Sequence, residues 1–195
     1  MQVRRMAVQL HQDLDVPGRS RSVLLVTPSS GQDGCLLSVM ALVKSLGEDL
    51  KQTVLLVDIA PLNPELTGLL GCDGCLGFSD LLLDENLAVE SAVMPTSGEN
   101  VSFLPAGRET GGVPMQALSR FLERALATFP CVVFYGGAIQ DNPVNLALAP
   151  LTGLVLVFAV DHQTRKKEIE KAQQMLRFSG AERVGLVLTA SEATR

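Results

Sequence analysis

The chain has 195 residues, of which 47% are apolar and 19% charged, and it carries a net charge of −5 at pH 7. This length predicts roughly one domain with a sizeable core, and the composition excludes a wholly disordered protein. The longest basic run is only Arg165–Lys167, which argues against a nucleic-acid-binding surface.

The sequence also bears on the compartment and on membrane insertion. Four cysteines, at positions 35, 72, 75 and 131, are too few and too scattered for a disulfide scaffold, which favours a reducing, cytoplasmic setting. Residues 1–15 lack the uninterrupted apolar core of a signal peptide. The most apolar stretch, residues 146–160, is shorter than the roughly 18 to 20 residues of a spanning helix. We expect an N-terminal helix and linker over residues 1–20 and a single α/β domain over residues 21–195.

Short apolar runs alternate with helical patterns along the chain. They predict six strands, at residues 22–27, 53–58, 101–105, 131–135, 154–160 and 184–188. They also predict helices at residues 35–46, 79–83, 115–128 and 168–178, with Gly47 and Gly180 as the stops of the first and last. The strands lack polar alternation, as expected when both faces are covered. We therefore predict an α/β fold with a doubly wound, mostly parallel sheet and helices on both faces.

The turn after the first strand is the first place to seek a ligand, because open parallel sheets bind ligands beyond the carboxyl ends of their strands. It reads T-P-S-S-G-Q-D-G-C-L over residues 27–36. A glycine-bearing loop that opens a helix presents backbone N–H groups to a phosphate. An NTPase loop also needs a lysine for the phosphates and a hydroxyl for Mg²⁺, and those positions hold Cys35 and Leu36. The candidate loop comprises Gly31, Gln32, Asp33, Gly34, Cys35 and Leu36.

Six segments, in this order, resemble those of the bacterial tyrosine kinase (capsular exopolysaccharide) family, within the MinD/ParA-like deviant P-loop proteins. The similarity extends from about Ser22 to Thr189. The segments are residues 27–36 (family T-S-x-x-P-G-E-G-K-S), 54–60 (V-L-L-I-D-A-D), 76–82 (G-L-S-D-x-L), 101–107 (L-x-V-L-P-A-G), 131–136 (Y-x-V-I-I-D-T) and 185–189 (G-V-V-L-N). The resemblance implies a P-loop NTPase-like fold.

The departures from this family all fall on phosphate and metal chemistry. Cys35 stands at the family's lysine, Leu36 at its Ser/Thr, Ala60 at the second aspartate of the second acidic motif and Tyr135 at the Walker B aspartate, whereas Asp58 is kept. Removing one such donor commonly costs roughly 10²–10³ in rate, so these four changes predict a protein without kinase catalysis. The family's C-terminal tyrosine cluster is also missing, since Tyr135 is the only tyrosine. We accordingly expect no cofactor, with ATP and Mg²⁺ as the alternative.

Three positions allow a chemical and a structural interpretation. Asp58 could hold an Mg²⁺-bound water, but with its partners replaced we favour a relic carboxylate that faces solvent or caps a turn. Cys35 at a helix N-terminus could be a reactive thiol, and we favour a small apolar filler. Cys72 and Cys75 form a lone C-x-x-C, which we interpret as an incidental loop rather than a metal or redox site.

The leading hypothesis is a non-catalytic pseudo-kinase that regulates or scaffolds exopolysaccharide (capsule) biosynthesis and export. The resemblance implies an inner-membrane chain-length or co-polymerase protein as partner, and hence a peripheral position at that membrane. A homo-oligomer is possible in this family, although the N-terminal E-x-x-R-x-x-R signature survives only at Arg5. One alternative is a MinD/ParA-like pseudo-ATPase that positions a pilus or secretion machine. Another is a nucleotide-binding switch in which a residue such as Lys44 replaces the lost lysine.

Overall fold

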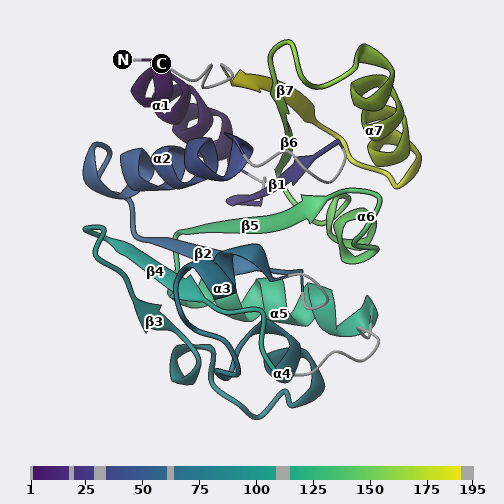
Figure 1. Ribbon diagram of the computed structural model, residues 1–195. Coiled ribbons are helices and arrows are strands. Elements are labelled where there is room, and N and C mark those ends of the chain that lie inside the picture. Colours follow the sequence, from purple (N-terminus) through teal and green to yellow (C-terminus); the bar gives the residue numbers. More distant parts are fainter. Residues whose placement is uncertain (1, 18–19, 29–33, 61–63, 109–114, 190–195) are drawn as a thin grey trace.

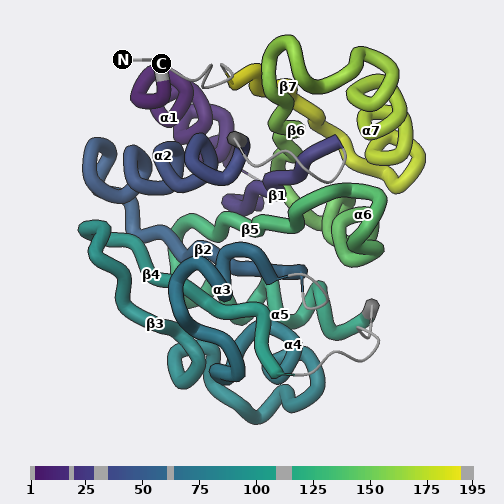
Figure 2. Tube along the Cα trace, viewed as in Figure 1, coloured from purple at the N-terminus to yellow at the C-terminus, as the bar shows by residue number. Residues whose placement is uncertain are grey.

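The computed structural model describes residues 2–17, 20–28, 34–60, 64–108 and 115–189. Its centre is a seven-stranded sheet with the order β3-β4-β2-β5-β1-β6-β7. The strands are β1 (Ser22–Thr27), β2 (Val54–Asp58), β3 (Met94–Pro95), β4 (Val101–Leu104), β5 (Cys131–Ala138), β6 (Leu154–Val160) and β7 (Val184–Thr189). Every neighbouring pair is parallel except β3 and β4. Figures 1 and 2 show β5 between β1 and β2, far from both in sequence.

Helices cover both faces of this sheet. They are α1 (Gln2–Leu14), α2 (Gly34–Glu48), α3 (Glu65–Leu69), α4 (Phe78–Leu83), α5 (Met115–Thr128), α6 (Val144–Leu148) and α7 (Lys166–Phe178), with a 3₁₀ turn η1 (Val89–Ser91). Apolar side chains of α1, α2 and α3 pack in one core with one face of the sheet, and those of α4, α5, α6 and α7 pack in a second core with the other face. Figure 1 shows α1 and α2 side by side over the first face. The predicted doubly wound α/β fold is confirmed.

The physical reason for the apolar strands is visible in their burial. All residues of β1, β2 and β6 are buried, because side chains of each strand alternate between the two helix-covered cores. In β6, for example, Val155 and Val157 face the α7 side, whereas Leu156 and Phe158 face the α1 and α2 side. An uninterrupted run of apolar residues is therefore the pattern that such a strand requires.

Gly47 is not the stop of α2, contrary to the sequence prediction. The helix continues to Glu48, and Gly47 allows a close approach of the segment that leads into β4. A Cβ atom at Gly47 would lie 2.6 Å from the carbonyl oxygen of Glu99 and 2.6 Å from a methyl carbon of Val101. The side-chain amide (Nδ2) of Asn100 also donates to the Gly47 carbonyl, at 3.2 Å. Close packing, rather than a left-handed cap, explains this glycine; Gly180, with a φ of +95°, does follow α7 as predicted.

The sequence pattern also predicted too few strands and too short a β5. It predicted six strands and missed β3, whose two residues pair antiparallel with β4 at the sheet edge and are too few to give a pattern. It ended β5 at Tyr135, whereas the strand extends through two glycines to Ala138. Gly136 is required there, since a Cβ atom would lie 1.6 Å from the Oδ1 atom of Asn145. The short helices α3 and α6 were likewise not predicted.

Candidate functional site

The candidate site lies where β2, β5 and β1 end side by side. Asp58 is the last residue of β2 and is paired in register with Tyr135 of β5, and Tyr135 is also paired with Leu25 of β1. The segment after β1 leads into α2, which begins at Gly34. This is the edge at which open parallel sheets bind their ligands. Topology thus brings Asp58, Tyr135 and the end of β1 to one edge of the sheet, which are parts of the segments that resemble the family's second acidic motif, Walker B motif and phosphate loop.

Only part of the predicted phosphate loop can be placed. Gly31, Gln32 and Asp33 lie outside the described residues, and Gly34 is the first residue of α2. Cys35 is fully buried and packs in the core beneath α1 and α2. Burial raises the pKa of its thiol to about 11, although a hydrogen bond with Thr189 opposes the shift. A protonated, enclosed thiol fits the apolar-filler interpretation of Cys35 and not the reactive one.

Asp58 is a structural acceptor, not a solvent-facing carboxylate, so that half of the sequence interpretation is wrong. It has no solvent exposure, and its Oδ1 accepts the Ala60 amide at 3.1 Å. Its Oδ2 accepts both the amide and the hydroxyl of Thr67, each at 2.9 Å. The Thr67 hydroxyl in turn accepts the Ala106 amide at 2.9 Å. Asp58 therefore caps the turn after β2 and ties it to α3 and to the segment after β4.

The pKa of Asp58 reflects this enclosure. Burial raises it to about 6, and the three hydrogen bonds from Thr67 and Ala60 oppose the rise. The nearby Glu65 adds a smaller contribution in the same direction as burial. A carboxylate whose two oxygens already accept three protein donors is poorly disposed to hold the hydration shell of a magnesium ion.

Tyr135 points its phenol toward α3. The ring is buried, and the hydroxyl donates to the Glu65 carboxylate at 2.7 Å, at the first residue of that helix. Burial, followed by the Glu65 hydrogen bond and the charges of Glu65 and Asp58, raises its pKa far above the usual range. Tyr135 shares its core with Cys35. A bulky neutral phenol is thus locked where the resembling family has a metal-binding aspartate.

These side chains do not fit an Mg²⁺-nucleotide complex of the family type. Leu36 is half-buried and apolar, Ala60 is buried, and neither offers a ligand atom on its side chain. Cys35 and Tyr135 are both neutral at physiological pH by the arguments above. Among the described residues, no group of three or more His, Cys, Asp or Glu side chains is arranged to hold a metal ion.

Lys44 lies well along α2 from the start of the helix. It follows Gly34 by ten residues, or about 15 Å along the helix axis. Its ammonium lies 3.8 Å from Glu48, one turn further on. Lys44 also lines a cavity of about 380 Å³ with residues such as Met40 and Phe103, on the side of α2 that faces β4.

Sequence reasoning missed the segment directly after β5, which contacts the ends of both β1 and β2. Gln140 donates to the Pro28 carbonyl at 3.2 Å and accepts from Lys171 of α7 at 2.9 Å. Asn142 donates to the Ile59 carbonyl at 2.8 Å, which joins this segment to the end of β2. No motif marks these contacts, because they depend on the path of β5 beyond Tyr135.

Two other family-like segments are in direct contact with each other. The amide of Phe78 donates to the Pro105 carbonyl at 2.8 Å, and that of Ser79 to the Ala106 carbonyl at 2.9 Å. Gly77 permits the approach, since a Cβ atom there would lie 2.2 Å from the Pro105 oxygen. Asp80 accepts the amides of Gly77 and Arg108, at 2.9 and 3.1 Å. These contacts show that the two segments have a structural role that requires neither phosphate nor metal.

Comparison with solved structures places this arrangement among known folds. The kinase domain of Escherichia coli tyrosine kinase ETK superposes with a TM-score of 0.82 at 16% identity, over 99% of this chain and 76% of that one. The BceF tyrosine kinase domain gives 0.79 at 21% identity, over 96% and 76%. The chain has the fold of the bacterial tyrosine kinase domains. Aquifex aeolicus MinD, a cell division protein, is also similar, with a TM-score of 0.66 at 13% identity over 86% and 68%.

Sequence comparison adds no closer relative. The sequence matches no protein-family model and no curated protein. The resemblance to the tyrosine kinase and MinD/ParA-like group, first drawn from short motifs, is therefore confirmed at the level of the fold.

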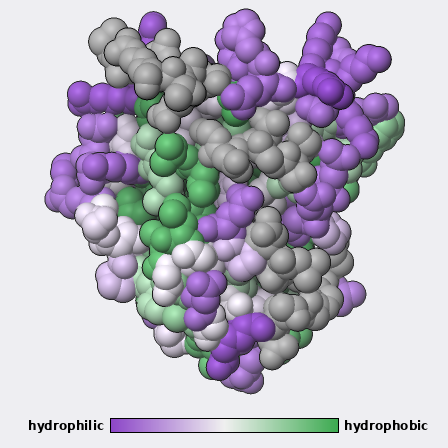
Figure 3. All heavy atoms as spheres, in the orientation of Figure 1, coloured by the Kyte–Doolittle hydropathy of each residue, from purple (hydrophilic) through white to green (hydrophobic). Residues whose placement is uncertain are grey.

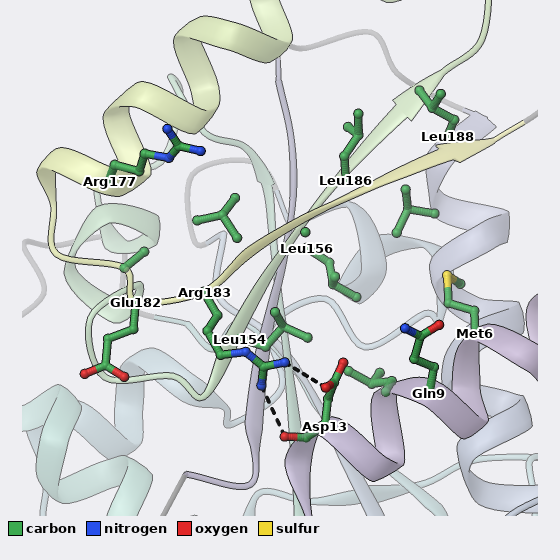
Figure 4. Close-up of a pocket in the computed structure, with 15 residues that line it drawn as sticks. Met6, Gln9, Asp13, Leu154, Leu156, Arg177, Glu182, Arg183, Leu186 and Leu188 are labelled. Atoms are coloured by element: carbon green, nitrogen blue, oxygen red, sulfur yellow. Dashed lines mark hydrogen bonds and ion pairs between the residues drawn. The ribbon is translucent and has the colours of Figure 1, made fainter. Parts of the chain in front are cut away.

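The surface has two further features, one at the β7 edge and one next to the candidate site. A groove of about 750 Å³ runs between α1 and the edge strand β7, with Met6 and Gln9 on one wall and Leu186 and Leu188 on the other side (Figure 4). An ion pair of 2.8 Å between Arg183 and Asp13 spans it. Hydrophobic side chains also gather on the face formed by α2 and α3 (Figure 3), where Leu37, Leu69 and Leu70 are exposed. Within the described part of the chain, no helix combines the length and apolarity needed to cross a membrane.

Proposed function

We propose that this chain is a non-catalytic relative of the polysaccharide tyrosine kinases that acts by binding, as a regulatory or scaffolding subunit in exopolysaccharide biosynthesis and export. The observation that carries the proposal is that the polar side chains at the ends of β2 and β5 are already bonded within the protein. Asp58 is enclosed by three protein donors, and Tyr135 is bonded to Glu65. Phosphoryl transfer depends on positioned cations and metal ligands, and these side chains supply neither.

The preserved segments support the same proposal. Gly77 and Pro105 join α4 to the end of β4 through close backbone contacts, and the Asp80 carboxylate accepts the amide of Arg108. The retention of these residues is therefore explained by folding alone. The changed positions, by contrast, are those whose family residues would touch phosphate or metal. A chain that keeps the structural residues and lacks the phosphate and metal ligands would keep a surface for binding other proteins but would not transfer phosphoryl groups.

The partner follows from the resemblance. We expect an inner-membrane chain-length or co-polymerase protein, which would hold this chain at the cytoplasmic side of the membrane. The runner-up is a MinD/ParA-like pseudo-ATPase that positions a pilus or secretion machine. The higher TM-scores of the tyrosine kinase domains, 0.82 and 0.79 against 0.66 for MinD, favour the first.

Calorimetric titration with ATP and ADP, with and without Mg²⁺, tests the loss of nucleotide chemistry. We expect no heat and no thermal stabilisation up to millimolar nucleotide. Micromolar, Mg²⁺-dependent binding would contradict the proposal and support the nucleotide-switch alternative. In that case Lys171→Ala, which removes the cation tied to Pro28 through Gln140, is the variant to titrate next. Lys51→Ala is its control, because Lys51 precedes β2 at the end opposite Asp58 and pairs with Glu99.

Affinity capture from solubilised membranes tests the partner. We expect a polysaccharide co-polymerase or another polysaccharide-assembly component among the proteins retained. Recovery of pilus or secretion components in its place would favour the positioning alternative, and recovery of neither would count against a role in polysaccharide export.

A further inference from the structure

The C-x-x-C segment forms a tight turn directly after α3. The amide of Cys75 donates to the Cys72 carbonyl at 3.1 Å, and Gly74 has a φ of +71°. A positive φ at the third position is the mark of a type II turn, for which glycine is the preferred residue. Such a turn brings the Cα atoms of its first and last residues within about 7 Å, and disulfides join Cα atoms roughly 4.4–6.8 Å apart. The backbone thus holds the two cysteines at bonding range.

The two thiols are also neighbours. The Cys72 thiol lies 3.5 Å from the Leu70 carbonyl, and Cys75 is close enough to Cys72 to contribute, after burial, to the rise of its thiol pKa. Both are free thiols and both are partly exposed. The other two cysteines differ in exposure, because Cys35 and Cys131 are buried. Burial raises their thiol pKa values to about 11 and about 12, and burial also raises that of Cys72. Cys72 and Cys75 are therefore a paired, accessible set, while Cys35 and Cys131 are enclosed.

We propose that Cys72 and Cys75 are a redox-active dithiol pair that closes to an intramolecular disulfide and reopens on reduction. This revises the interpretation of the segment as an incidental loop. With glutathione disulfide as oxidant, one cysteine thiolate attacks a glutathione sulfur and releases one glutathione thiolate. The second cysteine thiolate then attacks the mixed disulfide and releases the other. The two electrons pass to glutathione disulfide, and the two thiol protons end on the two released glutathione molecules.

The pair is connected to the candidate site by one backbone bond. The amide of Cys72 donates to the Thr67 carbonyl at 3.0 Å, and the same Thr67 donates to Asp58 through its amide and its hydroxyl. Closing the disulfide fixes the residue that continues α3, so the redox state acts on the end of the helix that holds Asp58. The proposal does not depend on the proposed function, because it needs neither nucleotide nor partner.

The experiment uses the full chain in buffers of varied glutathione to glutathione disulfide ratio, at pH 8 so that more thiolate is present. Samples are quenched in acid, alkylated with a maleimide and weighed intact. We expect oxidation to remove two hydrogen atoms and to abolish two alkylation sites, reversibly. Cys72→Ser and Cys75→Ser should each abolish the loss of the hydrogen pair. The protein unfolded before alkylation should show that Cys35 and Cys131 remain thiols.

A backbone variant separates the turn from mere thiol exposure. Gly74→Ala places a side chain on a backbone of positive φ. The disulfide-closed ring must keep this strained conformation, whereas the open dithiol form can relax it. Closure should therefore need a ratio of glutathione disulfide to glutathione that is roughly tenfold more oxidising. Gly71→Ala is the matched control, because Gly71 also has a positive φ, +66°, and like Gly74 has nothing within 4 Å of the added Cβ atom. It lies outside the ring, and we expect no shift.

Three results would overturn the proposal. One is separate glutathione adducts on Cys72 and Cys75 with no loss of the hydrogen pair. Another is a pair of hydrogen atoms still lost in Cys72→Ser. The third is a zinc ion retained by the reduced protein and released in that variant, which would assign the pair to a metal.

Discussion

Two regions of the molecule differ in whether their side chains already have partners within the chain. One is the edge of the sheet where β2 and β5 end, and the other is the outer edge of β7. At the first region, Asp58 and Tyr135 direct polar atoms inward, and the chain itself supplies their partners. At the second, β7 is the edge strand of the sheet that the described residues form, next to β6, and Leu186 and Leu188 are 42% and 60% exposed. An active site normally keeps its strongest donors and acceptors ready for a ligand. Here the region that resembles the family's catalytic site uses its donors and acceptors within the fold, whereas the leucines of the sheet edge stay exposed.

The largest expected effect comes from breaking the buried network. Asp58→Ala removes the acceptor of three hydrogen bonds and leaves buried donors on Ala60 and Thr67 without it. We expect the free energy of unfolding to fall by roughly 3 kcal/mol in urea denaturation. Asp161→Ala is the matched control, since Asp161 also follows a strand but is exposed, and it should change stability by less than about 0.5 kcal/mol. Equal effects at the two positions would refute the inward-facing assignment.

A smaller effect is expected from titrating the same carboxyl. The pKa of Asp58 is about 6 in the folded chain, against 3.8 in its ordinary state. The folded protein then binds the proton more tightly than the unfolded one, so this contribution to stability is complete below about pH 4 and is lost as pH rises through 6. Unfolding measured from pH 4 to 7 should show a decline of roughly 2 to 3 kcal/mol that Asp58→Asn removes. A wild-type advantage over Asp58→Asn that grows with pH would mean the opposite shift.

The smallest effect on stability is expected at the exposed edge of β7. Leu188→Lys places a charge on the exposed edge of β7, where no core contact is lost, and we expect stability to change by less than about 0.5 kcal/mol. Leu156→Lys on the neighbouring strand is the contrasting variant, because Leu156 is buried, and it should destabilise the fold severely. A substantial loss in Leu188→Lys would show that the edge is already packed.

The fold was accessible from sequence to a greater extent than the site. Buried parallel strands produce long apolar runs, and the bounds of β1, β6 and α5 were predicted to the residue. Gly47 was misassigned because a glycine that ends a helix and a glycine that admits a neighbouring segment have the same local pattern. The difference lies in Glu99 and Val101, some fifty residues away.

The candidate site shows the same limit. The resemblance to the family was enough to show that Cys35 and Tyr135 differ from its lysine and aspartate. The partner of the Tyr135 hydroxyl could not be predicted, because Glu65 lies in a five-residue helix without a recognisable pattern. The burial of Asp58 was missed for a related reason, because a strand-end carboxylate is usually solvated unless a distant segment covers it. Likewise, the C-x-x-C spacing was visible, but the turn that brings its thiols together depends on the φ of Gly74.

The Thr67 hydroxyl has a consequence for the dynamics of the molecule. It is donor to Asp58 and acceptor from Ala106 at once, so a single rotor joins the end of β2, α3 and the segment after β4. None of these three segments can open without breaking a bond held by another. The backbone amides of Ala60, Thr67 and Ala106 should therefore exchange with solvent as one cooperative unit, with a shared opening free energy, although the sequence separates them by up to 46 positions.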